Sequence, residues 1–190
     1  MPGLFEKGWF HERNDQWPGQ AMSLQVKGKK LLEKKTKFQD LVVFDTQTWG
    51  RCMLLDGVIQ ITDRDVCSYQ EMLAHTPMHC HKKPERVLIV GGGDGGMLRE
   101  VCKHDSVKYV KMVDIDGDVI EACKEYFPTV ACAFEDPRAD VEVGDGVKFV
   151  ANHSGEGFDV IIVDSSDPVG PAEGLFSAEF YKNIQKILKV

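Results

Sequence analysis

The sequence predicts an α/β protein, in which a parallel sheet covered by helices follows a small N-terminal antiparallel β module. Two observations support this prediction. In the last two thirds of the chain, short apolar runs alternate with helical patterns, which is typical of a parallel sheet covered on both faces. Earlier, residues 23–62 combine β-rich runs with an Asp-Gly turn at residues 56–57, a strong hairpin signal. We therefore expect a β module over residues 1–66 and a larger domain over residues 67–190.

Length and composition narrow the class of protein. With 190 residues, of which 43% are hydrophobic, the chain can bury a substantial core. Its formal net charge of -7 argues against nucleic acid as a partner, and no apolar run is long enough to span a membrane. The six cysteines are scattered without a C-x-x-C pair, which is typical of reduced thiols. We therefore expect a cytoplasmic protein that binds neither nucleic acid nor a membrane.

The N-terminal module is predicted from β-rich runs and the turns between them. Residues 41–44 read Leu-Val-Val-Phe, and the runs at residues 53–55 and 58–61 flank the Asp-Gly turn. The lysines between residues 27 and 37 are interpreted as a solvated strand face, since they lack the interleaved aromatic residues of a single-strand binder. Three aromatic residues upstream are expected to pack against the module or to form an interface: Trp9, Phe10 and Trp17.

Four short runs in the larger domain have the apolar character of buried strands. They occupy residues 87–90, 108–113, 140–143 and 158–163. Helical patterns lie before and between them, at residues 65–81, 97–103 and 119–127, around Val147 and Val150, and after residue 177. Pro128 is expected to end the third of these helices, because proline lacks the amide donor that a helix needs. Ser177 is expected to cap the last helix.

The first of these strands ends abruptly in the six residues GGGDGG. Gly91, Gly93 and Gly96 match G-x-G-x-x-G, a tight turn that brings backbone amides against a ligand at the start of a helix. Asp94 lies in the middle of this loop, where a carboxylate would repel the pyrophosphate of a dinucleotide. The loop therefore predicts a nucleoside-like ligand that carries positive charge.

Each of the four predicted parallel strands is followed by a carboxylate. These residues are Asp94, Asp114, Asp145 and Asp164, with Asp167 close to the last of them. Because ligands bind outside the carboxyl ends of the strands in open α/β sheets, we expect the carboxylates to line one crevice that takes cationic ligands. The alternative for Asp145, and for Asp116, is that each caps the helix that follows it.

The position of Asp114 indicates an adenosine-type ligand. It follows the glycine loop by about twenty residues, the spacing at which a carboxylate accepts both hydroxyls of a ribose. NAD would fit this spacing too, but Asp94 and the lack of an obvious hydride-relay histidine at this edge disfavour it. Class I methyltransferases share the sheet and the acidic ribose ligand, and their sulfonium donor is cationic. We therefore expect a Rossmann-like, class I methyltransferase-like domain, in which Asp164 and Asp167 suit an amine acceptor.

The one metal-like cluster in the sequence consists of His75, His79, Cys80 and His81. It lies at the end of the helix predicted over residues 65–81, where histidine is favourable beside the helix dipole. We therefore predict no metal site.

Four motifs together resemble one known family, the polyamine aminopropyltransferases, and within it the spermidine synthases. They are GGGDGG at residues 91–96, DSSDP-x-GP at 164–171, YQEM at 69–72 and WPGQ at 17–20. The resemblance implies transfer of an aminopropyl group from decarboxylated S-adenosylmethionine to putrescine, giving spermidine and methylthioadenosine. The donor would be a co-substrate, with no tightly bound cofactor. The resemblance also implies a homodimer and a donor-binding catalytic domain whose C-terminal part is absent, since the family's chain continues past Val190.

The resemblance implies roles for individual residues. The nucleoside of the donor would contact Gln39, Gly91, Gly93, Asp114, Asp145, Gly146 and Pro171. Gln70 and Asp94 would hold the donor's amine. Tyr69, Asp164 and Asp167 would contact putrescine, with Asp164 as the catalytic proton acceptor. Two alternatives stay open: a putrescine N-methyltransferase on the same scaffold, and an inactive regulatory or truncated homologue.

Proton transfer is the difficult part of such a reaction. An alkylamine with a pKa near that of lysine, about 10.4, is almost entirely charged at neutral pH, and an aspartate of ordinary pKa, about 3.9, is a weak base for it. We expect Asp164, with Tyr69, to orient the attacking nitrogen and to accept its proton as the new bond forms. The Gly/Pro-rich loop over residues 165–176 is a candidate lid.

Overall fold

The computed structural model describes residues 4–13 and 18–189, so that Trp17 lies outside the described residues. The chain divides into two compact units, Met1–Cys67 and Ser68–Val190. Each unit holds one sheet and its own hydrophobic clusters. No helix within the described ranges is both long enough and apolar enough to cross a membrane.

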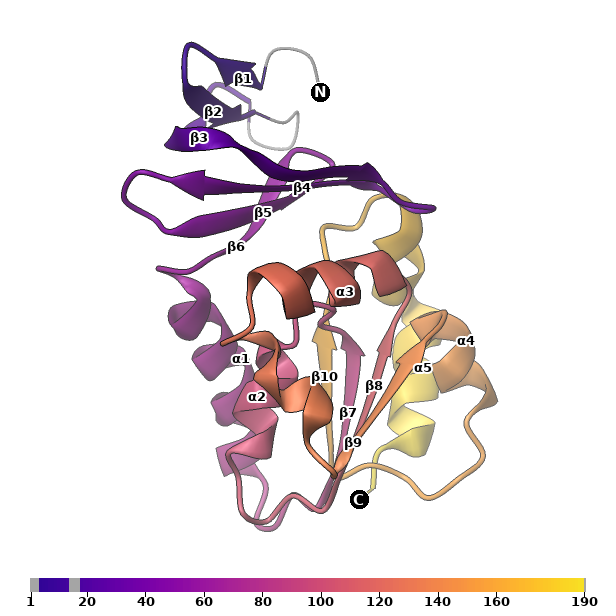
Figure 1. The fold of residues 1–190 in the computed structure, drawn as a ribbon. Helices are drawn as coiled ribbons and strands as arrows, with labels where there is room; N and C mark the ends of the chain where they lie inside the picture. The colour runs from indigo at the N-terminus through magenta and orange to yellow at the C-terminus, as the bar shows by residue number, and fades with distance from the viewer. Residues whose placement is uncertain (1–3, 14–17, 190) are drawn as a thin grey trace. The chain divides into compact units, whose positions relative to one another are not determined.

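The N-terminal unit is a six-stranded antiparallel sheet whose strands follow one another in chain order (Figure 1). The strands are β1 (Phe5–Glu6), β2 (Trp9–Glu12), β3 (Met22–Lys35), β4 (Asp40–Thr46), β5 (Arg51–Leu55) and β6 (Val58–Thr62). Asp56 and Gly57 form the turn between β5 and β6 with φ angles of 50° and 83°, as the Asp-Gly signal predicts. One hydrophobic cluster of the unit is formed by Phe10, Leu24, Val42, Phe44, Cys52 and Leu54.

The strands β1 and β2 were not predicted from the sequence. Phe10 on β2 is fully buried, and its ring centroid lies 5.6 Å from that of Phe44 on β4. Its neighbour Trp9 points to the opposite face of the strand and is 40% exposed. Of Trp9 and Phe10, Phe10 therefore provides the packing that was expected for the aromatic residues at this end of the chain.

The second unit contains a four-stranded parallel sheet with the strand order β10-β7-β8-β9. Its strands are β7 (Arg86–Gly91), β8 (Tyr109–Asp114), β9 (Ala139–Val143) and β10 (Val160–Asp164). Its helices are α1 (Val66–Cys80, which begins at the end of the first unit), α2 (Gly96–Cys102), α3 (Gly117–Tyr126), α4 (Gly146–Asn152) and α5 (Ala178–Ile187). The predicted Rossmann-like α/β fold with an N-terminal antiparallel module is confirmed.

Helices cover both faces of the parallel sheet (Figure 1). Because successive side chains of a strand point to opposite faces, Val87 and Ile89 join a cluster with α1, α2 and α3. Leu88 and Val90 join a second cluster with α4 and α5. This explains why the apolar run over β7 is continuous rather than alternating.

Two short 3-10 helices were not predicted. They are η1 (Ala131–Glu135) and η2 (Gly170–Phe176), and η2 lies within the stretch expected to be an irregular loop. Such short helices lack a full apolar period, so the sequence pattern does not reveal them. The predicted cap of the last helix is confirmed, since Ser177 Oγ accepts a hydrogen bond of 3.1 Å from the Phe180 amide.

Burial predicts a difference between two valines of the parallel sheet. Val87 is fully buried on β7, whereas Val143 on β9 is 60% exposed. We expect Val87→Ala to lower the free energy of unfolding of this unit by about 2 kcal/mol, and Val143→Ala to change it by less than about 0.5 kcal/mol. Urea unfolding followed by far-ultraviolet circular dichroism measures both, because the helices belong to this unit. Equal losses for the two variants would contradict the assignment of the core.

Candidate active site

The carboxyl ends of the central strands bring the predicted acids to one edge of the parallel sheet. Strand β8 ends at Asp114 and β10 ends at Asp164, which lies opposite Gly91 in the pairing of β10 with β7. The glycine loop that follows β7 carries Asp94. Three of the predicted acids therefore lie around a single loop, at the edge where α/β sheets bind their ligands.

Glycine is required in this loop because the backbone and the acids approach it closely. Gly91 has a φ of +85°, and a Cβ at this position would overlap the backbone oxygen of Asp164. The amide of Gly92 donates to that same oxygen at 2.9 Å. The amide of Gly93 donates to Asp114 Oδ2 at 2.9 Å. The loop is thus hydrogen-bonded to the ends of both neighbouring strands.

Asp94 accepts a hydrogen bond at each of its carboxylate oxygens. The Gly96 amide donates to Oδ1 at 2.7 Å, and Gln70 Nε2 donates to Oδ2 at 3.0 Å. Gln70 comes from α1 and is 1% exposed. It fits against the start of α2 because position 96 is glycine, where a Cβ would overlap the Gln70 carboxamide. The structure therefore brings together Gln70 and Asp94, the two residues expected to hold the donor's amine.

Tyr69 and Asp164 also lie together. Tyr69 Oη donates to Asp164 Oδ1 at 2.8 Å, across 95 residues of sequence. Gln70 and Tyr69 are adjacent in α1, so this helix supplies one hydrogen-bond donor to Asp94 and one to Asp164. The site therefore contains two carboxylates, Asp94 and Asp164, and each accepts a hydrogen bond from a neutral side chain of α1.

Burial raises the pKa values of all three acids. Desolvation, and then the nearby Asp94 carboxylate, raise the pKa of Asp164 to about 7, against which the hydrogen bond from Tyr69 acts. Desolvation raises the pKa of Asp114 to about 6, although the amides of Asp116 and Gly93 favour its charged form. The pKa of Asp94 is also raised by desolvation. Asp164 is therefore a stronger base than an aspartate of ordinary pKa, and the sequence does not show this because it does not reveal burial.

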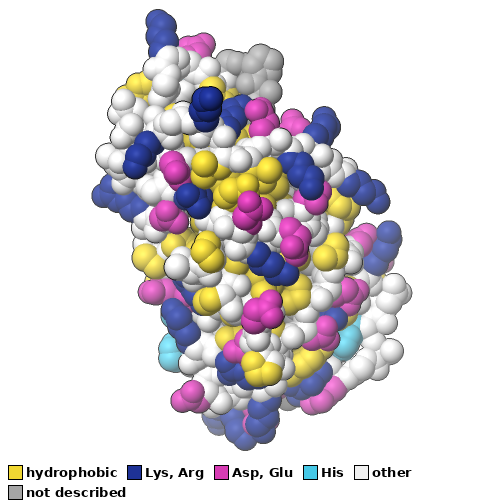
Figure 2. Space-filling model, in the orientation of Figure 1, with side chains coloured by type: hydrophobic (Ala, Val, Ile, Leu, Met, Phe, Trp, Pro, Cys, Tyr) yellow, Lys and Arg dark blue, Asp and Glu magenta, His cyan; other side chains and the backbone are white. Residues whose placement is uncertain are grey.

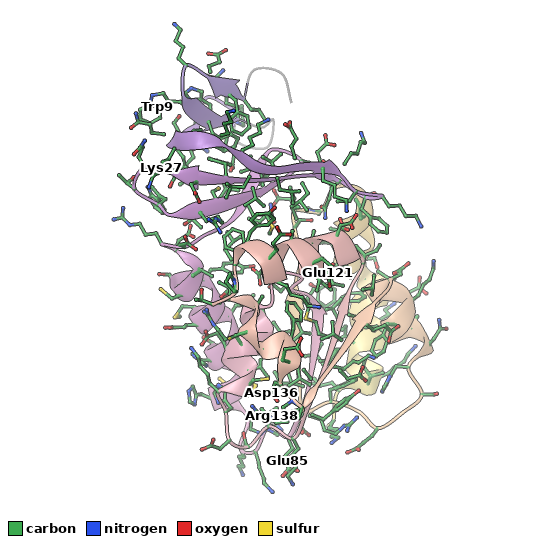
Figure 3. All side chains as sticks on the ribbon, viewed as in Figure 1. Trp9, Lys27, Glu85, Glu121, Asp136 and Arg138 are labelled. Carbon is green, nitrogen blue, oxygen red and sulfur yellow. The ribbon has the colours of Figure 1, made fainter. Side chains whose placement is uncertain are left out.

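The two ends of the parallel sheet differ in how charges are paired. Before β7 and β9 begin, Glu85 pairs with lysines at 2.7 and 2.8 Å, and Asp136 pairs with Arg138 at 2.7 Å (Figure 3). At the carboxyl end, none of Asp94, Asp114 and Asp164 forms an ion pair in the part of the chain that the structure describes. Half-buried acids with raised pKa values and no cationic partner indicate a functional site.

Two other predicted acids cap helices of this unit. Asp145 caps α4 by accepting from the amides of Val147 and Lys148 at 3.0 and 3.2 Å. Asp116 caps α3 in the same way, so the capping alternative describes the contacts of both residues. Gly146 is the first residue of α4, Pro171 lies in η2, and Asp167 is exposed in the loop after β10.

Gln39 lies in the N-terminal unit, in the turn between β3 and β4. Its backbone amide donates to Thr36 Oγ1 at 3.0 Å, and its carbonyl accepts from the Thr36 amide at 2.9 Å. These contacts hold the turn within that unit. The role expected for Gln39 at the nucleoside stays a prediction.

Two histidines of α1 lie close to a histidine in the segment after α2. His75 Nδ1 lies 2.9 Å from His104 Nε2, and the ring centroids of His79 and His104 are 5.2 Å apart. Within residues 4–13 and 18–189, no three His, Cys, Asp or Glu side chains are arranged to hold a metal ion. His104 was not part of the metal-like cluster seen in the sequence, because it lies 23 residues beyond His81.

One residue beside the site was not predicted. Arg99 on α2 donates from Nη2 to Gln70 Oε1 at 3.2 Å, on the side of the amide opposite Asp94. Its signal in the sequence is an arginine three residues after Gly96, within the first turn of the helix that follows the glycine loop. That signal is weak, since an arginine on a helix is usually a solvated residue.

Surface charge gives no sign of a nucleic-acid stripe on the face that Figure 2 shows, where lysines and arginines are interspersed with acids. The lysines of β3 include exposed side chains, and Lys30 pairs with Glu33 at 2.7 Å. This fits their interpretation as a solvated strand face.

Comparison with protein families gives two matches. The family model described as "Spermine/spermidine synthase domain" matches residues 66–190, and the one described as "Spermidine synthase tetramerisation domain" matches residues 8–63. "Spermidine synthase 2" of Arabidopsis thaliana is 47% identical over 182 residues, which are 96% of this chain and 53% of that protein. "Spermidine synthase" of Schizosaccharomyces pombe is 49% identical over 98% of this chain and 62% of its own length. The chain thus spans little more than half of these relatives.

Solved structures agree. A structure of "Spermidine Synthase in Complex with Transition State Analogue AdoDATO" superposes with a TM-score of 0.91 and 38% identity, covering 98% of this chain and 63% of that one. "Spermidine Synthase from Thermotoga Maritima" superposes with a TM-score of 0.88 and 39% identity, covering 95% and 60%.

The raised pKa of Asp164 predicts a pH-dependent gain in stability on its removal. The folded protein holds this proton up to about pH 7, whereas an aspartate in the unfolded chain releases it near a pKa of about 3.9. The wild-type protein is therefore destabilised progressively as pH rises through this window. We expect Asp164→Asn, which is never charged and still accepts from Tyr69, to raise Tm by roughly 3 °C at about pH 8 and by less at about pH 5.

Asp140→Asn is the matched control in this thermal-unfolding experiment. Asp140 on β9 accepts from Tyr109 Oη at 2.7 Å, but this hydrogen bond lowers the pKa of Asp140. The control variant should therefore show no gain in Tm with rising pH. A gain for Asp164→Asn that is the same at both pH values would contradict the raised pKa.

Proposed function

Since the chain belongs to the spermine/spermidine synthase family, we propose that the protein is a spermidine synthase. It transfers the aminopropyl group of decarboxylated S-adenosylmethionine to putrescine, giving spermidine and methylthioadenosine. The observation that carries this proposal is the pair of neighbouring acidic positions, Asp94 beside Gln70 and Asp164 beside Tyr69. Two carboxylates fit a reaction in which both the donor and the acceptor carry an amine.

The donor binds at the glycine loop in this proposal. Asp94 and Gln70 hold its primary amine, and Asp114 accepts the ribose hydroxyls while the Gly93 amide keeps its carboxylate in place. The remaining nucleoside contacts are assigned to Gln39, Gly91, Asp145, Gly146 and Pro171. No tightly bound cofactor or metal takes part, since the donor is a co-substrate.

The acceptor binds at Tyr69, Asp164 and Asp167. Tyr69 and Asp164 take the attacking nitrogen, which their 2.8 Å hydrogen bond supports, and Asp167 takes the far amine. In this arrangement the nitrogen lone pair forms the new N–C bond while the C–S bond breaks. The bonding electrons stay on sulfur, a neutral thioether leaves, and the proton released from nitrogen passes to Asp164.

A pKa of about 7 suits Asp164 to this step. A general base works best when its pKa lies near the working pH, because it is then both partly ionised and able to hold the proton. An exposed aspartate would return the proton at once. The loop over residues 165–176, with η2 in it, is proposed as the lid that excludes water over this base.

Assembly and compartment are part of the proposal. The match of residues 8–63 to a tetramerisation domain supports an oligomer, of which a homodimer is the smallest form. A cytoplasmic location is supported by the six cysteines, all of them free thiols.

The proposed activity is tested by methylthioadenosine release from decarboxylated S-adenosylmethionine, with putrescine, spermidine and cadaverine as parallel acceptors. We expect putrescine to be used, and Asp164→Asn to lower kcat about 100-fold or more while donor binding changes little. Asp140→Asn serves again as the control. Methyl transfer from S-adenosylmethionine would instead support the N-methyltransferase, and near-normal turnover by Asp164→Asn would remove that residue from the mechanism.

Asp94→Ala distinguishes binding of the donor's amine from binding of its nucleoside. Because Asp94 is assigned to the donor's amine, the variant should raise the KM for decarboxylated S-adenosylmethionine roughly tenfold or more. Binding of methylthioadenosine, which lacks that amine, should change less than about threefold in calorimetric titration. An equal loss for both ligands would show that Asp94 acts on the loop rather than on the amine.

A further inference from the structure

We propose that Arg99 is a positioning residue for the donor: it fixes the orientation of the Gln70 carboxamide, and through it the Asp94 carboxylate. The inference rests on the proposed function, which assigns Asp94 to the donor's amine. It adds a residue outside the four motifs of the sequence, one that reaches the reacting molecule only through another side chain.

Arg99 is held in place by three acceptors from three parts of the unit. Its guanidinium donates to Gln70 Oε1 on α1 at 3.2 Å, to Glu100 Oε1 on α2 at 2.8 Å, and to the carbonyl of Thr129 at 3.1 Å. The planar fork of arginine suits such a set of acceptors. The side chain is 18% exposed, so these hydrogen bonds are largely shielded from water.

The arrangement permits one orientation of the Gln70 amide. Its oxygen faces the Arg99 guanidinium, and its nitrogen faces Asp94 Oδ2 at 3.0 Å. A flipped amide would set oxygen against the carboxylate and N–H groups against the guanidinium, so that both hydrogen bonds would be lost. Arg99 therefore decides that Gln70 presents a donor to Asp94.

Glu100 keeps Arg99 from turning towards Asp94 itself. It is fully buried, and it also accepts from Lys103 at 2.6 Å and lies 3.2 Å from His75 Nε2. A buried carboxylate with this many donors is fixed, so the Nε group of Arg99 is fixed with it. The positive charge of Arg99 thus stays behind the neutral amide of Gln70.

This position has a chemical consequence for the donor. A direct arginine–Asp94 ion pair would occupy the carboxylate that has to receive an ammonium group. With Gln70 in between, Asp94 is oriented by two neutral donors, Gln70 Nε2 and the Gly96 amide, and no cationic side chain of the described residues competes with the ligand for it. Arg99 also favours the ionised form of Asp94, acting against the burial that raises the pKa of this group.

Arg99→Met tests the inference, with Lys103→Met as the matched control. Both substitutions remove one positive charge that pairs with Glu100 on the same stretch of chain, but Arg99 is the one that also donates to Gln70. We expect Arg99→Met to raise the KM for decarboxylated S-adenosylmethionine about tenfold, while kcat at saturating donor changes less than about twofold. The control variant should leave the KM within about twofold of the wild type, and the affinity for methylthioadenosine should be unchanged in both.

Two further variants keep the inference open to refutation if Arg99→Met folds poorly. Arg99→Lys retains the charge but not the fork, so a positioning role predicts that it fails to restore the KM. In a Gln70→Met background, Arg99→Met should raise the KM no further, because its effect passes through Gln70.

The outcomes separate the two proposals. A wild-type protein that transfers no aminopropyl group would overturn the proposed function and this inference with it. An active wild type whose Arg99→Met variant has a normal KM would overturn the inference alone. Three other results would also overturn the inference alone. They are a normal KM in Arg99→Lys, a further rise in KM when Arg99→Met is added to Gln70→Met, and a loss of affinity for methylthioadenosine as large as that for the donor.

Discussion

The constraint that shapes the rest of the structure is the desolvation of three neighbouring acids at the carboxyl edge of the parallel sheet. Asp94, Asp114 and Asp164 are brought there by three neighbouring strands, and burial raises the pKa of each. Such an arrangement lowers the stability of the folded chain at neutral pH, since ionised groups are held in a poor solvent. It persists because the helices on both faces bury enough apolar surface to offset this cost.

The opposite edge of the same sheet shows that the crowding is local. There Glu85, Asp136 and Arg138 are paired with opposite charges, and the pKa values of both acids are lowered to about 2. The parallel topology makes this division possible, because all strands begin at one edge and end at the other. Charges that join elements together are placed where the strands begin, and charges left for a ligand are placed where they end.

Sequence reasoning predicted much of this arrangement and failed at identifiable points. The strands, the glycine loop and the acids after the strands follow from apolar periodicity and from residue types that are strongly constrained locally. The raised pKa of Asp164 and the role of Arg99 did not follow, because both depend on burial and on partners far apart in sequence. The 3-10 helices η1 and η2 were missed because segments of five and seven residues are too short to show a helical apolar period.

The choice of partners for the acids explains how the site keeps its charge. Across the described residues, Asp94, Asp114 and Asp164 accept hydrogen bonds from neutral groups: backbone amides, the Gln70 carboxamide and the Tyr69 hydroxyl. Neutral donors fix the direction of a carboxylate without cancelling its charge, which a lysine or arginine in contact would do. The guanidinium of Arg99 does not contact Asp94 directly but orients the Gln70 carboxamide, which donates to Asp94. A site built in this way is strongly oriented yet still negative, which is the condition for discriminating a cationic ligand from a neutral one of similar shape.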